Sequence, residues 1–159
     1  MTGDVDVRSK AGGEEGRRRQ PVQRREDQDR QARFQDPFTD DVINAAIEVH
    51  RTIGPGLLES LYERCLEREP TLRGYTVARQ QSVTVSYKGL VFDQELRFDL
   101  LVNGVLLLEL KCIAAIQGVH QAQALSYMRL LDVPKGLILN FHHPRLTDDI
   151  VRLELPSRS

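Results

Sequence analysis

Apolar residues recur every three or four positions in the segment that follows Pro37. Thr39 or Asp40 can cap this segment, and the run Gly54-Pro55-Gly56 ends it; its apolar positions are Val42, Ala46, Val49 and Ile53. A second helix is predicted from about Leu57, with an apolar stripe at Leu58, Leu61, Tyr62, Cys65 and Leu66. The folded region is therefore expected to begin with two consecutive helices.

The spacing of apolar residues changes to two after Gly74. Residues 83–87 alternate between apolar and polar, Lys88-Gly89 is expected to be a turn, and a meander is predicted to continue through 90–92 and 95–102. Residues 105–110 are almost all apolar, which is typical of a central strand buried on both faces. The pattern then predicts a helix over about 116–131 and strands over 137–141 and 151–155. Helices that cover a mixed β-sheet form a single α/β sandwich, which is the fold class we expect.

The connection between the strands at 95–102 and 105–110 decides which side chains share a face. A two-residue turn at Asn103-Gly104 would set Asp99 opposite Leu108, on the other face from Glu109. A connection of odd length instead groups seven apolar residues on one face: Leu96, Phe98, Leu100, Val102, Leu106, Leu108 and Leu110. Because a slip of one residue moves every side chain across the sheet, the burial pattern outweighs the turn dipeptide and predicts the odd connection.

In that register Asp99, Glu109 and Lys111 project together from two neighbouring strands. Two carboxylates offer the hard oxygen ligands that Mg²⁺ prefers, and an ammonium group two residues after the second one can position or help deprotonate an attacking water. This residue set is typical of a metal-dependent phosphodiester-cleaving site. The competing interpretation is a structural ion pair between Glu109 and Lys111 in a sheet that merely carries three charges.

Three polar residues fall on one side of the helix expected over 116–131. His120, Gln123 and Tyr127 are separated by three and four positions, so they are candidates to approach the same site. For Gln123 and Tyr127, a hydrogen bond at the edge of the core is an equal alternative.

Two further residues are candidates on the first pair of helices. His50 lies on the inner half of the first helix, and we expect it to hydrogen-bond the Gly54-Pro55-Gly56 turn rather than bind a metal, because hard Mg²⁺ sites prefer oxygen. Glu59, taken alone, is expected to be a solvent-facing glutamate that forms surface ion pairs.

Residues 1–35 differ in composition from the rest of the chain. Gly, Gln, Arg, Asp and Glu dominate, and so few aliphatic residues cannot bury enough apolar surface to offset the entropy of ordering. We expect a disordered charged tail, followed by one folded domain over 36–159. The tail carries nine basic and seven acidic residues, which leaves the domain with 13 basic and 16 acidic residues. Such a balance weakens any nucleic-acid binding that depends on charge alone.

Hydropathy also bears on location. Every apolar run is too short to cross a bilayer, and the start of the chain has no apolar segment of the secretory type. We therefore expect no membrane partner and a cytoplasmic location.

Several runs of residues in the folded region resemble those of a known protein family. Residues 56–62 read GLLESLY and match the signature of the GxxExxY protein family, and blocks at 46–56, 86–89, 99–102, 109–111, 122–127 and 136–141 are similar to the blocks that follow in that family. The family is placed in the PD-(D/E)XK nuclease superfamily, which has a restriction-endonuclease-like core of a mixed sheet flanked by helices. Gln123 and Tyr127 resemble the QxxxY helix of the RecB-type exonuclease and Cas4 branch.

The resemblance implies a role for each matched residue. Asp99 and Glu109 would bind Mg²⁺ or Mn²⁺, and Glu59, the helix-borne acid, would complete the metal shell directly or through water. The carbonyl of Leu110 would be a further ligand, and Lys111 would act on the nucleophile. The expected function is metal-dependent hydrolysis of DNA or RNA. A non-hydrolytic module that binds nucleic acid or protein, and an enzyme that acts on another phosphodiester, stay open as alternatives.

Overall fold

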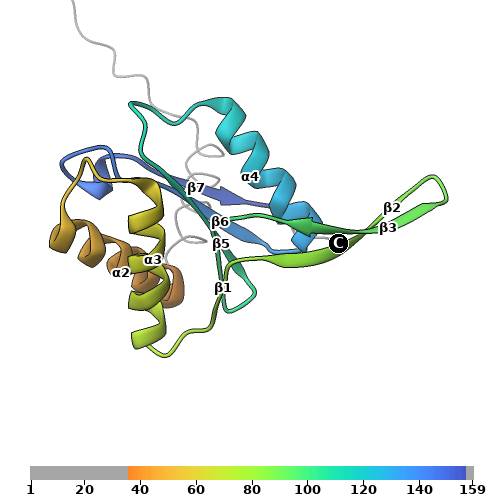
Figure 1. Cartoon of the computed structure of the whole chain (residues 1–159), viewed down its shortest axis with the longest axis horizontal. Helices are drawn as coiled ribbons and strands as arrows, with labels where there is room; N and C mark the ends of the chain where they lie inside the picture. Colours follow the sequence, from red (N-terminus) through yellow and green to blue (C-terminus); the bar gives the residue numbers. More distant parts are fainter. Residues whose placement is uncertain (1–35, 157–159) are drawn as a thin grey trace, which may run out of the picture. The chain divides into compact units, whose positions relative to one another are not determined.

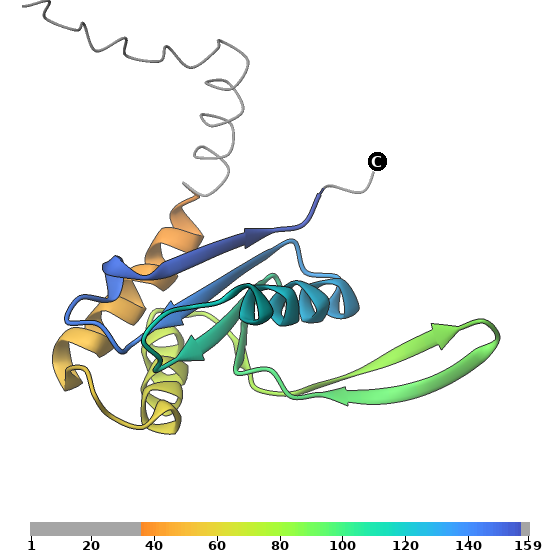
Figure 2. The same cartoon turned by 90° about the horizontal axis from the view of Figure 1, so that it is seen from above.

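A computed structural model describes residues 36–156 of the chain. Both views of the fold show a mixed sheet with helices on its two faces and a hairpin that reaches away from it (Figures 1 and 2). The elements in chain order are α2 (Pro37–Ile53), α3 (Glu59–Leu72), β1 (Val77–Ala78), β2 (Gln81–Tyr87), β3 (Leu90–Leu96), β4 (Leu100–Val102), β5 (Leu106–Lys111), α4 (Gly118–Leu131), β6 (Lys135–Asn140), a 3₁₀ turn (Leu146–Asp148) and β7 (Ile150–Glu154).

The main sheet has five strands in the order β1-β4-β5-β6-β7. Only β5 and β6 are parallel, and α4 makes the crossover between them, as a parallel pair requires. Each residue from Leu106 to Leu110 is buried, because α4 packs over one face of β5 while α2 and α3 pack over the other. The predicted α/β class and the buried central strand are both confirmed.

The two N-terminal helices form where the apolar spacing placed them, with different ends. Asp36, not Thr39 or Asp40, caps α2: its Oδ1 accepts the Thr39 N–H at 2.7 Å, and Pro37 occupies the first turn, where no N–H is needed. The second helix begins at Glu59, and Leu58 is 78% exposed instead of lying on the buried stripe. Short capping side chains and proline therefore decide the first boundary more than the onset of apolar residues does.

The predicted meander is wrong in one respect. Strands β2 and β3 pair only with each other, as a separate two-stranded sheet, and β4 covers just Leu100–Val102. The chain leaves strand geometry between β3 and β4, so alternation does not carry across that break. Leu96 and Phe98 consequently pack in the core beneath α4, whereas the other five of the seven grouped apolar residues pack beneath α2 and α3.

The odd connection between β4 and β5 is confirmed. Leu100 pairs with Leu108 and Val102 with Leu106, so three residues form the loop. Asn103 and Gly104 both have positive φ, as the dipeptide suggested, but Val105 is part of the loop as well and is 44% exposed. This register puts Asp99 level with Glu109.

Two further predictions concern the N-terminal tail and membrane-spanning helices. The tail predicted over 1–35 lies outside the described residues, as do residues 157–159. Among the helices of residues 36–156, none is long and apolar enough to span a bilayer.

Candidate active site

The centre of the candidate site is a pair of carboxyl groups on neighbouring segments of the sheet. Asp99 immediately precedes β4. Glu109 lies in β5, two residues before the end of the strand, and is level with Asp99 across the antiparallel pair. The Leu110 N–H donates a hydrogen bond to Asp99 Oδ2 at 2.7 Å. This bond orients the Asp99 carboxylate along the face on which Glu109 lies.

Glu109 is the most perturbed residue of the pair. It is only 8% exposed, and its Oε1 is buried without any hydrogen-bond partner among residues 36–156. Burial raises the pKa of Glu109 to about 8, and the negative charge of Asp99 adds to the rise. A buried carboxylate with an orphaned oxygen costs free energy unless a cation or a proton compensates it.

Asp99 responds to the same surroundings. Burial raises its pKa, the bond from the Leu110 N–H opposes that rise, and the nearby charge of Glu63 adds to it. The negative charges of Asp99 and Glu109 are only partly offset by their neighbours, so the two carboxyl groups compete for one proton when no cation is bound.

Glu59 is a third acid near the carboxyl pair, and it comes from α3, which precedes the sheet in the chain. It is the first residue of α3 and is half-buried; burial raises its pKa, and the charge of Asp99 raises it further. Its position depends on Tyr62, whose hydroxyl donates to the Gly54 carbonyl and accepts the Leu57 N–H at 3.1 Å. The Tyr62 side chain is fully buried and stacks on Phe141 with ring centroids 4.5 Å apart, so it braces the turn that delivers Glu59.

Lys111 supplies positive charge to the three acids. It ends β5 on the same face as Glu109, two residues further along, and its charge opposes the pKa rise of Glu59, Asp99 and Glu109. The structure thus brings the ammonium group into the electrostatic neighbourhood that the sequence pattern predicted.

Two charged residues near the site were missed by the sequence reasoning. Glu63 lies one turn after Glu59 in α3, and Arg79, from the segment between β1 and β2, binds its Oε1 at 2.7 Å. The Arg79 guanidinium also lies 3.5 Å from Glu67 Oε2. The hydrogen bond to Glu63 is the main cause that raises the pKa of Arg79, and the charge of Asp99 makes a smaller contribution. A lone arginine between two strands carries no sequence signal, so only the fold could reveal this pair.

The donor set fits a hard divalent cation only in part. The orphaned oxygen of Glu109 and the adjacent Asp99 carboxylate are the ligand type that Mg²⁺ and Mn²⁺ take. Across residues 36–156, however, no three His, Cys, Asp or Glu side chains come together closely enough to hold one metal ion. Whether Glu59 contacts a cation directly or through water stays a prediction.

The two candidate histidines have structural partners instead. His50 is buried against Phe141, and its Nε2 lies 2.8 Å from the His143 carbonyl. Its bond to the glycine turn is made by the backbone instead, where the His50 carbonyl accepts the Gly54 N–H at 2.8 Å. His120 accepts the Gln117 N–H through Nδ1 at 2.9 Å and thereby caps the start of α4. This bond gives His120 a structural role at the end of the helix, and any part it plays at the site stays a prediction.

Gln123 and Tyr127 interact with each other on α4. The Gln123 amide donates to the Tyr127 hydroxyl at 3.4 Å; Gln123 is exposed, and Tyr127 packs partly against the core beneath α4. This agrees with the alternative of a hydrogen bond at the core edge, and the pair's role toward a substrate stays a prediction.

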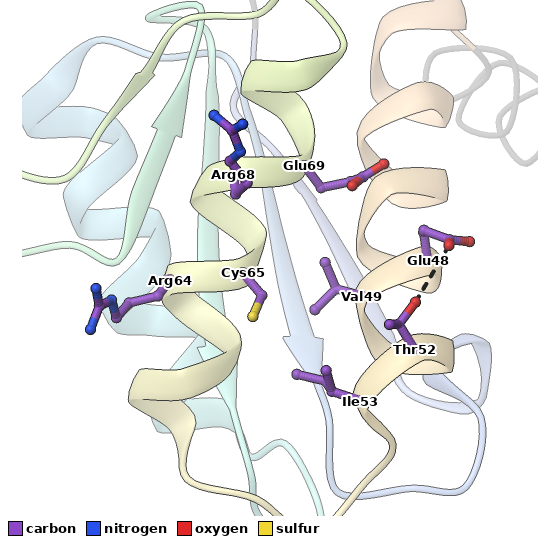
Figure 3. A pocket seen from close by; sticks show the side chains of 8 residues that line it. All are labelled: Glu48, Val49, Thr52, Ile53, Arg64, Cys65, Arg68 and Glu69. Carbon is purple, nitrogen blue, oxygen red and sulfur yellow. Dashed lines mark hydrogen bonds between the residues drawn. The ribbon is translucent and has the colours of Figure 1, made fainter.

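A pocket of about 540 Å³ lies between α2 and α3, apart from the predicted site residues. Figure 3 shows Cys65 of α3 facing Val49 and Ile53 of α2, and Glu48 bonded to Thr52; Arg64, Arg68 and Glu69 of α3 also line the pocket. Its charges are of both signs and do not converge. We therefore place the candidate chemistry at the carboxyl pair of the sheet and not in this pocket.

Paired carboxyls on adjacent segments of a helix-covered mixed sheet, followed by a lysine, define a nuclease-like class of protein. The family model of the PD-(D/E)XK nuclease superfamily matches residues 36–153, and the chain belongs to that superfamily. Among solved structures, the one titled "Crystal structure of SSO0001" is similar, with 18% identity and a TM-score of 0.43 over 79% of this chain and 60% of the other. No curated protein matches the chain.

Proposed function

We propose that this protein is a Mg²⁺- or Mn²⁺-dependent phosphodiester hydrolase that acts on DNA or RNA. The observation that carries the proposal is the buried Glu109 carboxyl, with its orphaned oxygen, beside Asp99 at the end of the central strand. An ordinary structural position would not be expected to leave a buried carboxyl oxygen without a hydrogen-bond partner. Membership of the nuclease superfamily supports the same chemistry.

The proposed roles rest on the family resemblance together with the placement of the residues. Asp99 and Glu109 would hold the cation, with the Leu110 carbonyl as a further ligand and Glu59 acting directly or through water. The bound cation would neutralise phosphate charge and lower the pKa of a water molecule. Lys111, on the same face as Glu109, would orient the attacking water and stabilise charge that develops on the phosphate.

The finer classification is part of the proposal. The GLLESLY run at residues 56–62 supports the GxxExxY family, and Gln123 with Tyr127 supports the RecB- and Cas4-like branch, in which they would position a metal-bound water or the substrate backbone. Tyr62 now has a physical role in that signature, because its hydroxyl braces the turn before Glu59. We also propose a cytoplasmic location.

A second function is favoured by one observation, the excess of acidic residues in the domain. With 16 acidic and 13 basic residues outside the first 35, the domain has little charge of its own with which to attract a polyanion. A non-hydrolytic module that binds nucleic acid or protein on the same fold would account for this balance.

The test uses the purified full chain with single- and double-stranded DNA and RNA, each with Mg²⁺ or Mn²⁺. We expect cleavage of at least one substrate and at least a 100-fold loss in Asp99→Asn, since removal of a ligand charge disables the cation site. Asp148→Asn is the matched control, because Asp148 is an exposed aspartate of the 3₁₀ turn and is not among the predicted site residues; it should retain full activity.

A second readout does not depend on choosing the right substrate. Mn²⁺ should raise the melting temperature of the wild type and of Asp148→Asn but not of Asp99→Asn. Absence of both cleavage and metal-induced stabilisation in the wild type would reject the hydrolase and favour the binding module.

A further inference from the structure

The β2–β3 hairpin is built to project from the domain. Lys88 and Gly89 both have positive φ, of 44° and 88°, which is the geometry of a tight hairpin turn whose twist matches the strands. Seven residue pairs join β2 to β3, and neither strand pairs with the main sheet. Figures 1 and 2 both show this hairpin reaching out beyond the five-stranded sheet.

The two faces of the hairpin differ in chemistry. Side chains that pair across the strands share a face, so Val85 with Phe92 and Tyr87 with Leu90 form an apolar surface toward the turn, and Val83 with Gln94 and Leu96 with Gln81 continue the same face toward the base. The opposite face carries the pairs Ser82 with Glu95, Thr84 with Asp93 and Ser86 with Val91. Both acids of the hairpin therefore lie on the polar face.

The domain covers only the base of the apolar face. Val83 packs against the core beneath α4, and Leu96 is buried in the same core. Towards the turn the cover ends: Tyr87, Leu90 and Phe92 are 63%, 59% and 41% exposed. A contiguous apolar surface that a fold extends into solvent marks an interaction site.

The geometry points to a second copy of this chain as the occupant, with the apolar faces of two hairpins packed against each other about a two-fold axis. In such a contact each residue meets its own kind or a near neighbour, so any charge on the face would meet a like charge. The apolar face has none: Asp93 and Glu95 would stay in solvent, and Lys88 lies at the turn. The hairpin is well suited to pair with itself.

The charge of the hairpin disfavours a nucleic acid as the occupant. Residues 81–96 carry one basic residue, Lys88, against Asp93 and Glu95. A polyanion would gain little from this surface, because phosphate contacts supply most non-specific affinity. This inference is independent of the proposed nuclease function.

The available area predicts a reversible dimer. The exposed parts of Tyr87, Leu90 and Phe92 amount to roughly 300 Å² per copy, judged from the 150–250 Å² that a large aromatic side chain buries. Two copies would bury roughly 600 Å² of apolar side chain plus a polar rim, which is less than the roughly 1,200 Å² of a standard specific interface and is the size of a weak, transient contact. We therefore expect dissociation on dilution rather than an obligate pair.

Sedimentation velocity of the full chain over a concentration series, from about 1 to 500 µM, tests this inference. The wild type should shift from monomer to dimer, and Leu90→Glu should weaken the dimer at least 30-fold, because it places two like charges on the apolar face. Val91→Glu is the matched control: Val91 is the next residue and is 64% exposed, but it lies on the polar face, so its dimer should match the wild type.

Circular dichroism should show that each variant is folded, so that a weakened dimer is not due to unfolding. Tyr87→Ser, which adds no charge, should also weaken the dimer. A wild type that stays monomeric at every concentration would overturn the inference. So would a dimer that Leu90→Glu leaves intact or that Val91→Glu weakens equally. A monomer that binds an oligonucleotide through Leu90 would assign the face to nucleic acid instead.

Discussion

Replacement of Glu109 by glutamine tests whether a buried carboxyl at this position is held at a cost in stability. Glutamine keeps the shape of the side chain, and its amide can donate to the adjacent Asp99 carboxylate, but it has no charge to lose or gain. The prediction is that Glu109→Gln unfolds less readily than the wild type at high pH and about equally near pH 4.5.

The magnitude follows from the pKa. Burial, with help from the Asp99 charge, raises the pKa of Glu109 from 4.5 to about 8, and each unit corresponds to about 1.4 kcal/mol. Because the folded pKa is the higher one, the folded state keeps its proton longer than the unfolded state. The associated stability is complete below about pH 4.5 and is lost as the pH rises through 8. The full loss would be roughly 5 kcal/mol, and relaxation around the charge reduces it, so we expect roughly 2–4 kcal/mol.

Urea unfolding at pH values from 4.5 to 9, followed by circular dichroism because the chain has no Trp, measures this difference. The free energy of unfolding should fall with pH in the wild type and stay much flatter in Glu109→Gln. Glu95→Gln removes an exposed carboxyl from the hairpin and should follow the wild type. Parallel profiles for wild type and Glu109→Gln would refute the reasoning. Added Mn²⁺ should restore stability at pH 8 in the wild type but not in Glu109→Gln, since the cation replaces the proton.

Two further substitutions test how the site is supported. Tyr62→Phe keeps the stacking on Phe141 but removes the hydroxyl that joins Gly54 to Leu57, so urea unfolding should show a loss of about 1 kcal/mol and cleavage should slow; an unchanged midpoint would mean that the turn holds itself. Gly136→Ala would place its Cβ 2.8 Å from Met128 Sδ, and a thermal melt should show a loss of about 1–2 kcal/mol. Met128→Ala in the same chain should relieve the clash, so the double variant should be less destabilised than the two single losses combined; additive losses would contradict the contact.

Local sequence pattern was sufficient for the central part of this fold. Seven apolar residues in two runs favoured an odd connection over the Asn103-Gly104 turn, and the structure has a three-residue loop. Residues on paired strands are close in sequence here, so their relative placement depends on strand alternation and loop length alone. That is why Asp99 and Glu109 could be placed level with each other in advance.

Alternation failed where the backbone left strand geometry. The break at residues 97–99 sent Leu96 and Phe98 to a different core from Leu100, and it released the hairpin from the main sheet. Periodicity records the local conformation only while that conformation continues, so a bend of a few residues resets which face each side chain occupies.

The sequence by itself determined the fold class, the central strand and the level pairing of the two sheet acids, because each depends on neighbours a few residues apart. Only the tertiary structure decided that His50 binds His143, that Glu63 meets Arg79 and that the Tyr62 hydroxyl braces the turn before Glu59. Packing between helices and strands sets these contacts, and no local spacing encodes the distance between elements that the chain joins through loops. The depth to which Glu109 is buried, and hence its raised pKa, has the same origin.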